Sequence, residues 1–471
     1  MSSVLIRGGR VVTAAGEYDA DVLVEHGRIT AIGEALASAG TVIDAEGLLV
    51  MPGGVDPHTH IDLDEASWTT ADDFTVATAA AAAGGTTCVV DFAMQEPGRS
   101  FPDTLAKWHG KLERTPPLVD VGFHVAVTDL RRGGTLSDLA ELAAQGVTSF
   151  KLFMAYKGDV MVDDETLFRT LEVGRREGCL TLVHAENGDV IDVLVKRALA
   201  AGHVEPRWHA ATRPPLTEAE ATARAITLAR LAGAPLYVVH VSCREALEPI
   251  VAARRAGAAV WGETCPQYLV IDEAALDRED GAKYVFTPPP RTLADREALW
   301  RALARRELQS VGSDHCPYQY ATEKAPAADF SLMPNGAPGI EHRMQVLWEL
   351  GVRAERLTAS DLVDLCSTTP ARLFGLYPRK GTIAVGSDAD LVLWDPEREV
   401  EISAATHRSR ADYSIYEGLR VHGGARTVLV RGRVVVDDGD VVGDPGDGRF
   451  VARDRVPAGK SAPQREITPT G

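Results

Sequence analysis

The chain has 471 residues and a formal net charge of −18; 45% of its residues are hydrophobic and 25% are charged. This length allows a large buried core, and the composition is typical of a globular protein and excludes disorder over most of the chain. A strongly negative chain without a block of Lys or Arg would be repelled by a phosphate backbone, so we expect no nucleic-acid partner.

From about Val4 to Ala45 the pattern is one of short alternating strands separated by glycines. This opening lacks the long apolar core of a signal peptide. Nowhere does an apolar run approach the roughly 18 residues that a membrane helix needs. We therefore expect a cytoplasmic protein with no membrane partner.

The central part of the chain contains eight apolar runs, each followed by a helical stretch rich in Ala, Leu, Glu and Arg. Near-continuous Val, Leu and Phe character is typical of strands buried on both faces, and helices between such strands make the sheet parallel. The sequence therefore predicts an α/β fold, a (β/α)8 TIM barrel, whose chemistry would lie at the carboxyl ends of its strands. The runs are Leu48–Val55, Thr86–Phe92, Val119–Val127, Val147–Met154, Leu180–His184, Leu236–Val241, Ala258–Glu263 and Leu308–Gly312.

The end of the chain repeats its opening pattern. The segment Val428–Val435 echoes the first strands, and Ala389–Trp394 supplies another strand nearby. We expect both chain ends to pair into one small β-sandwich beside the barrel; two unrelated sheet fragments are the alternative. The predicted division gives residues 1–50 and 376–440 to the sandwich and 51–375 to the barrel. Residues 441–471 would form an extended tail that is either mobile or laid against another subunit.

Residues that can bind metals recur where the predicted strands end. A single His-x-His pair is weak support for a metal site, but a barrel would gather all of these residues on one rim. Imidazole and carboxylate ligands favour Zn²⁺, with Mn²⁺ or Co²⁺ as substitutes. The sequence thus predicts a two-metal hydrolase. The residues are His58 and His60, Lys151, His184, His240 and Asp314, which follow or end the first, fourth, fifth, sixth and eighth runs.

Lys151 is the unusual member of this set because an ammonium group cannot bind a metal. Burial lowers the pKa of a lysine and leaves a neutral amine. Such an amine can capture CO₂ and become a carbamate, an anionic ligand whose two oxygens can bridge two metals. A lysine paired with a neighbouring acid is the alternative, but the other ligand segments favour the carbamate.

These residues, with Pro52–Asp56 before the His pair, resemble the amidohydrolase superfamily and more closely its dihydropyrimidinase/hydantoinase branch. The family's fold is a barrel with a sandwich made from both chain ends, which agrees with the pattern described above. The likeness covers nearly the whole chain and is carried by Phe150–Lys157 (FKLFMAYK), Val183–Gly188 (VHAENG), Gly312–Pro317 (GSDHCP) and Pro334–Glu341 (PNGAPGIE).

The resemblance implies a binuclear zinc site with an activated hydroxide between the metals. In this assignment His58, His60 and Asp314 bind one zinc ion. His184 and His240 bind the second, and carbamylated Lys151 bridges the two.

The resemblance also implies roles in catalysis and substrate binding. Asp314 would accept the proton of the attacking hydroxide and return it to the departing ring nitrogen. Tyr156 would donate a hydrogen bond to the developing alkoxide; a packing tyrosine is the alternative for this position. Main-chain atoms at Thr287 and Asn335 would hold the polar groups of the substrate.

The chain departs from the family pattern in two places. The family commonly has Ser where Thr287 stands, an exchange that a main-chain contact tolerates. The loop 64–68, with the sequence DEASW, replaces a Pro-Phe-Gly-Gly-like turn that helps to shape the pocket for the ring substituent. Altered substrate preference and ordinary surface variation are both open for this loop. We interpret His315 as a structural neighbour of Asp314 and His342 as part of a helix start.

The resemblance predicts an enzyme that opens dihydropyrimidines or 5-substituted hydantoins to N-carbamoyl amino acids, with a small cyclic ureide or amide as its partner. It also suggests a homotetramer. An allantoinase-like or dihydroorotase-like hydrolase is one alternative, against which the setting of Tyr156 speaks. A non-catalytic interaction protein, like the collapsin response mediator proteins that have lost metal ligands, is the other, but here every ligand position is filled.

Overall fold

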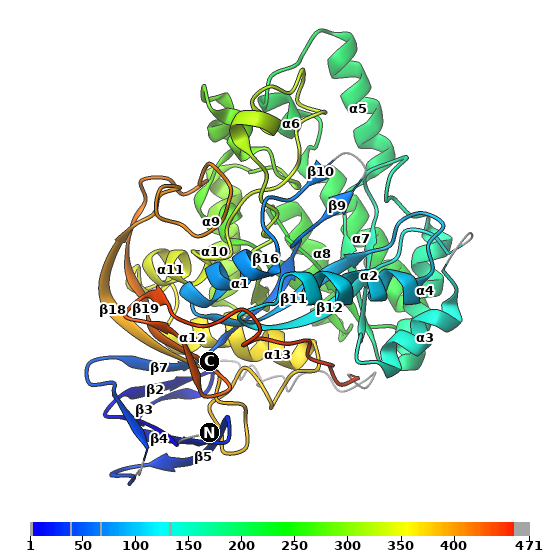
Figure 1. The fold of residues 1–471 in the computed structure, drawn as a ribbon. Helices are drawn as coiled ribbons and strands as arrows, with labels where there is room; N and C mark the ends of the chain where they lie inside the picture. The colour runs from blue at the N-terminus through cyan, green and yellow to red at the C-terminus, as the bar shows by residue number, and fades with distance from the viewer. Residues whose placement is uncertain (1–2, 38–39, 66–67, 131–133, 456–471) are drawn as a thin grey trace, which may run out of the picture.

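The computed structural model of the protein describes residues 3–37, 40–65, 68–130 and 134–455. Its centre is a nearly closed barrel of eight parallel strands in the order β17-β16-β15-β14-β13-β12-β11-β8 (Figure 1). Every residue of these strands is buried, as expected for a parallel sheet covered on its outer face and packed inside. The strands are β8 (Gly54–Thr59), β11 (Thr86–Met94), β12 (Asp120–Ala126), β13 (Ser149–Phe153), β14 (Leu180–His184), β15 (Leu236–Val238), β16 (Val260–Thr264) and β17 (Ser310–Val311).

Helices connect the barrel strands and cover the barrel (Figure 1). No helix within the described ranges has both the length and the apolar character to cross a bilayer. The longer helices are α1 (Phe74–Ala83), α2 (Phe101–Arg114), α3 (Leu136–Ala144), α4 (Asp164–Glu177), α5 (Gly188–Ala200), α7 (Pro215–Ala232), α8 (Arg244–Arg255) and α10 (Leu293–Ala304). The short helical segments are α6 (Arg207–Ala211), α9 (Pro266–Val270), η1 (Glu273–Asp277), η2 (Gly281–Tyr284), η3 (Tyr320–Lys324), α11 (Arg343–Leu347), η4 (Trp348–Arg353), α12 (Ala359–Val363), η5 (Asp364–Thr368) and α13 (Thr369–Leu373).

The predicted barrel is confirmed, but its first strand was wrongly placed. The run Leu48–Val55 joins two elements: β7 (Leu49–Pro52), which pairs with β2 and β18 outside the barrel, and the start of β8. Gly53 separates them where the chain passes so close to Thr87 that a Cβ would lie 2.0 Å from its Oγ1. The apolar run is continuous because both strands are buried. His58 therefore lies within β8 rather than after it.

Both chain ends form the predicted sandwich, in which strands from the N-terminus and the C-terminus lie side by side (Figure 1). The pairing of β7 with β18 joins the two ends of the sequence into one sheet, and a second apolar core fills the sandwich. One sheet has the order β5-β4-β1-β6: β1 (Val4–Arg7), β4 (Asp21–Glu25), β5 (Arg28–Gly33) and β6 (Thr41–Asp44). The other has the order β21-β20-β19-β18-β7-β2-β3: β2 (Arg10–Thr13), β3 (Gly16–Asp19), β18 (Leu391–Glu401), β19 (Arg420–Val430), β20 (Arg433–Asp437) and β21 (Asp440–Val441).

The seam between the first and last barrel strands is closed by the segment that follows β17. The amide of Asp314 donates to the carbonyl of His58 at 3.0 Å, and the amide of His60 donates to the carbonyl of His315 at 2.9 Å. Lower in the seam, Arg343 donates to the carbonyl of Val311 at 2.9 Å. The closure of the barrel therefore brings Asp314 beside the His pair.

The described part of the predicted tail packs against its own chain. Residues 446–455, which we call the C-terminal arm, lie against the floor of the barrel of the same chain. The amide of Val121 donates to the carbonyl of Arg449 at 2.9 Å, and the amide of Val451 donates to the carbonyl of Val121 at 2.8 Å, so the arm pairs in parallel with the start of β12. Val451 also packs into a small apolar cluster with Val55 and Cys88. Residues 456–471 lie outside the described ranges.

Candidate active site

All six predicted metal ligands converge at the carboxyl ends of the barrel strands. The ring centres of His58 and His60 lie 5.4 Å apart, those of His58 and His240 5.5 Å, and those of His184 and His240 4.5 Å. The Nζ atom of Lys151 reaches the same space and lies 5.0 Å from the ring centre of Phe92, against which His58 and His60 also pack. The order of the barrel strands thus brings six side chains from distant segments together at the barrel rim.

Three of these residues form a compact cluster at the barrel seam. Asp314 Oδ1 lies 3.1 Å from His58 Nε2 and 3.3 Å from His60 Nε2. The potential ligand atoms of the three residues all lie within 4.8 Å of one another, as a metal site requires. This grouping matches one half of the predicted ligand set.

The other two imidazoles face each other directly. His184 Nδ1 and His240 Nε2 are 2.8 Å apart, while His184 Nε2 lies 2.7 Å from Glu186 Oε2. Because a carboxylate only accepts hydrogen bonds, His184 donates from Nε2 and keeps its Nδ1 lone pair for a ligand. Glu186 thereby fixes the tautomer that metal binding needs.

Sequence reasoning missed Glu263, which does the same for His58. Its Oε1 lies 2.5 Å from His58 Nδ1, and its Oε2 accepts a hydrogen bond from the hydroxyl of Tyr237 at 2.8 Å. His58 can therefore present Nε2 to a cation. Glu263 ends a predicted strand run, so its position at the rim was a usable signal. Cys265 lies close enough to His58 and Glu263 to form a second potential ligand group, but Glu263 is already engaged there.

The electrostatics of the metal-free site favour a positive charge at the seam. Burial opposes protonation of His58, but the charges of Asp314 and Glu263 outweigh it and raise the pKa of His58 to about 9. Burial alone would raise the pKa of Asp314, yet His58 and His60 hold it well below its usual range. Burial lowers the pKa of His184 and His240. The carboxylates of Asp314 and Glu263 thus favour positive charge at this point of the site.

Lys151 is a buried amine without a partner. Its side chain is fully buried, and its Nζ has no hydrogen-bond partner among the described residues. Burial lowers the pKa of Lys151 to about 7, because Asp314 and Glu263 compensate only in part. The predicted alternative, a lysine paired with a neighbouring acid, finds no support in this geometry.

Two of the predicted substrate-binding residues, Tyr156 and Thr287, lie together beside His184. The ring of Tyr156 lies 5.2 Å from that of His184, and its hydroxyl is hydrogen bonded to the side chain of Thr287. Burial raises the pKa of Tyr156, which keeps the phenol protonated as a donor. The buried Oδ1 atom of half-buried Asn335 lacks a hydrogen-bond partner among the described residues. Gly336 N donates to Val285 O at 3.2 Å, which ties the two segments together.

Three site residues hold a left-handed backbone that side chains other than glycine rarely adopt. The φ angles are 64° at Tyr156, 41° at His240 and 52° at Asp314. Such conformations cost about 1–3 kcal/mol each and persist where the surrounding structure enforces them, commonly at functional sites. No sequence pattern indicated them.

Two further predictions concern neighbours of the site. His315 Nε2 lies 3.0 Å from buried Asp72, and its Nδ1 accepts from Gly339 N at 3.2 Å, so it braces the segment that carries Asp314. His342 is the residue before α11, in agreement with its predicted place at a helix start.

The unusual loop forms a small hairpin of β9 (Asp64–Glu65) and β10 (Trp68–Thr69). Residues 66–67 lie outside the described ranges. Asp64 is held by Lys107 at 2.8 Å and Lys111 at 2.6 Å, so its negative charge points back into the protein.

Comparisons with known proteins agree with this geometry. The sequence profile of the Amidohydrolase family matches residues 49–435. A D-hydantoinase of Geobacillus stearothermophilus is 48% identical over 454 residues, covering 95% of this chain and 96% of the relative, and a dihydropyrimidinase of Arabidopsis thaliana is 40% identical over 453 residues, covering 95% and 85%. The crystal structure of a dihydropyrimidinase from Brevibacillus agri superposes with a TM-score of 0.94 at 48% identity, covering 96% of this chain and 99% of that one. The chain therefore belongs to the amidohydrolase family, in its dihydropyrimidinase/hydantoinase branch.

Proposed function

We propose that this protein is a metal-dependent hydrolase that opens the ring amide of dihydropyrimidines or 5-substituted hydantoins to give N-carbamoyl amino acids. The names of the relatives, D-hydantoinase and dihydropyrimidinase, support this substrate class. The observation that carries the proposal is the cluster at the barrel rim, where four imidazoles and one carboxylate meet a lysine whose Nζ has no hydrogen-bond partner among the described residues.

The amidohydrolase family is metal-dependent, and the donors of this chain fit two cations. Lys151 Nζ lacks a hydrogen-bond partner among the described residues, while Glu263 and Glu186 hold two imidazoles in metal-binding tautomers. We assign His58, His60 and Asp314 to one Zn²⁺ and His184 and His240 to the other; Mn²⁺ and Co²⁺ suit the same donors. Bound there, the two cations would polarise a carbonyl and lower the pKa of water.

Lys151 would bridge the metals as a carbamate. The lone pair of the neutral amine attacks the carbon of CO₂, an N–C bond forms, and one N–H proton leaves, which yields an anion with two oxygen donors. The low pKa of the buried amine makes the neutral form available near pH 7. This modification would also resolve the cost of leaving an amine unpaired in the core.

The remaining residues would move a proton and stabilise charge. Asp314 would accept the proton of the attacking water and deliver it to the ring nitrogen as the amide bond breaks. Tyr156 donates to the oxygen on which negative charge develops. Main-chain groups at Thr287 and Asn335 orient the ureide, and the hydrogen bond between the two segments keeps these groups in register.

A substrate panel tests the proposal. Purified protein is assayed with dihydrouracil, hydantoin, a 5-substituted hydantoin, allantoin and dihydroorotate, and its metal content is measured. We expect turnover of the first three with about two metals per chain. Turnover confined to allantoin or dihydroorotate would overturn the substrate assignment, and inert metal-free protein would overturn the enzymatic role.

A further inference from the structure

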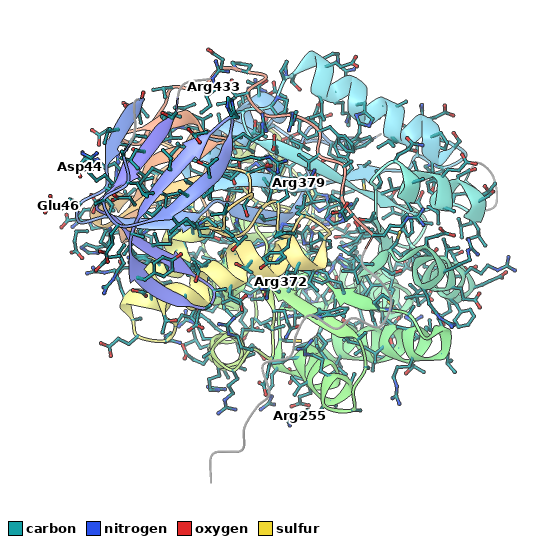
Figure 2. All side chains as sticks on the ribbon, turned by 90° about the horizontal axis from the view of Figure 1, so that it is seen from below. Asp44, Glu46, Arg255, Arg372, Arg379 and Arg433 are labelled. Carbon is teal, nitrogen blue, oxygen red and sulfur yellow. The ribbon has the colours of Figure 1, made fainter. Side chains whose placement is uncertain are left out.

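The C-terminal arm sends one charged side chain into the floor of the barrel. Arg453 is only 3% exposed, and its stem lies along Gly122, where an added Cβ would come 3.2 Å from Arg453 Cδ. Figure 2 views the molecule from below, where Arg379 and Arg433 lie beside this arm; they bind Ala452 O and Asp447 respectively. The arm is thus fixed from outside while Arg453 points inward.

The guanidinium of Arg453 is incompletely paired. It donates from Nη2 to Phe123 O and, at 2.8 Å, to Ser149 Oγ, whereas its Nε and Nη1 have no partner among the described residues. A buried cation without a carboxylate is costly. If this position only anchored the arm, burying an apolar side chain there would cost less free energy than burying a guanidinium.

A chain of hydrogen bonds leads from this guanidinium up the barrel interior. Ser149 Oγ lies 2.6 Å from His124 Nδ1, and His124 Nε2 lies 2.9 Å from Pro57 O. Pro57 is the residue before His58, so its carbonyl belongs to the peptide unit that carries the ligand.

The direction of every bond in this chain is fixed. The Pro57 carbonyl only accepts, so His124 carries its proton on Nε2. Burial, reinforced by the charge of Arg453, holds the pKa of His124 well below its usual range, so His124 is neutral and Nδ1 accepts. Ser149 must then donate its single proton to His124, and its lone pairs face Arg453, which can only donate.

His124 also reaches the site through ring packing. Its ring stacks on Phe92 at 4.7 Å between ring centres, and Phe92 in turn contacts His58 and His60 at 5.0 Å each. Two independent contacts therefore connect the orientation of His124 with the His pair.

We propose that Arg453 is a positioning residue of the active site, acting through Ser149 and His124 on the peptide and the aromatic ring that orient His58 and His60. The C-terminal arm then helps to position the metal-ligand residues, in addition to covering the barrel floor. Only the kinetic part of the test below rests on the proposed function.

Hydrogen exchange tests the inference without metal or substrate. Ser149→Ala removes the central hydroxyl but leaves the arm docked, and the matched control Thr148→Val removes a neighbouring buried hydroxyl that has no hydrogen-bond partner among the described residues. In metal-free full-length protein, we expect peptides covering residues 54–60 to exchange at least about fivefold faster in Ser149→Ala, with peptides from β15 unchanged. Thr148→Val should match the wild type. Equal exchange in all three proteins, or uniformly faster exchange throughout Ser149→Ala, would overturn the inference.

Kinetics supply the second measurement. In the metal-loaded protein, Arg453→Met should lower kcat by about 10–100-fold with little change in KM, and Arg453→Lys, which keeps a donor, should recover part of it. The control is Arg455→Met, on the same arm, which removes only a surface ion pair with Glu177. An equal fall in kcat/KM in both Arg453 variants and in the control would show a merely structural arm. If the wild type turned over no substrate, the proposed function would fail while the exchange result still decided this inference.

Discussion

Each end of the barrel buries a lysine, and the pKa values of the two lysines are shifted in opposite directions. Lys151, at the mouth, has no hydrogen-bond partner within the described structure, and burial lowers its pKa to about 7. Lys380, at the floor, lies 2.7 Å from Asp120, 3.1 Å from Asp388 and 2.7 Å from Asp390, and these carboxylates overcome burial and raise its pKa. The charge of Lys380 is therefore balanced by carboxylates of the protein, whereas the amine of Lys151 is not.

Two further buried lysines show that burial alone does not mark a reactive amine. Burial also lowers the pKa of Lys324 to about 7, but its Nζ donates to Val285 O at 2.7 Å. Lys111 is bound to Asp64 and lies 4.1 Å from the ring centre of Trp108. Of these four buried lysines, only Lys151, whose Nζ has no hydrogen-bond partner among the described residues, lies among metal-ligand side chains. The lack of a hydrogen-bond partner therefore distinguishes Lys151 from Lys324, whereas the lowered pKa does not, because both lysines share it.

Replacing Lys151 should give the largest effect. Lys151→Met keeps the length of the side chain but cannot form a carbamate, so we expect kcat/KM to fall on the order of a thousandfold or more, with loss of bound metal. The midpoint of thermal unfolding of the metal-free protein should stay level or rise, because an unpaired polar group is removed from the core. Lys157→Met, which alters an exposed lysine paired with Asp189, is the matched control and should be active. An active, metal-loaded Lys151→Met protein would remove the distinction between the two lysines.

Replacing Lys380 should have the opposite pattern. Lys380→Met leaves three buried carboxylates short of one cation, so we expect a loss of about 3–5 kcal/mol in the free energy of unfolding. Denaturant unfolding followed by circular dichroism measures this loss. The folded fraction should keep its kcat/KM, since Lys380 lies at the far end of the barrel from the ligand cluster. Unchanged stability would mean that the ionic cluster at the floor contributes nothing net.

Replacing Lys324 should change how the free energy of unfolding depends on pH. Its pKa is about 7 in the folded protein and near 10.5 in the unfolded chain, so between these values the unfolded state binds more protons and stability rises with pH. The difference in unfolding free energy between the wild type and Lys324→Met should therefore grow in favour of the wild type by about 1 kcal/mol per pH unit from pH 7 to 9. Parallel pH profiles of the two proteins would show that Lys324 keeps its proton when buried.

Sequence patterns predicted the features of this molecule that depend on short segments. His184 ends a run of buried residues and Asp314 follows one, and that local signal placed both at the barrel rim. The boundary between β7 and β8 was missed because the two buried strands form one apolar run, interrupted only by Gly53.

Features that depend on distant partners could not be predicted. Glu263 meets His58 across 205 positions of sequence, and Arg453 meets Phe123 across 330. The left-handed backbone at Tyr156, His240 and Asp314 is likewise imposed by surrounding packing rather than by the identity of those residues.

The smallest expected effect concerns Lys111 and the hairpin at the mouth. Asp64→Asn removes a carboxylate that is 45% exposed, and Lys111 keeps the carbonyl of Asp62 and the face of Trp108 as partners. Such a half-exposed ion pair contributes about 0.2–1 kcal/mol, so the ratio of kcat/KM for a bulky 5-substituted hydantoin to that for dihydrouracil should change by no more than about fivefold. A larger change would mean that Asp64 turns from the lysines to the substrate during the reaction. In that case the fixed hairpin would be a moving part, and Lys111 would hold it only in the resting protein.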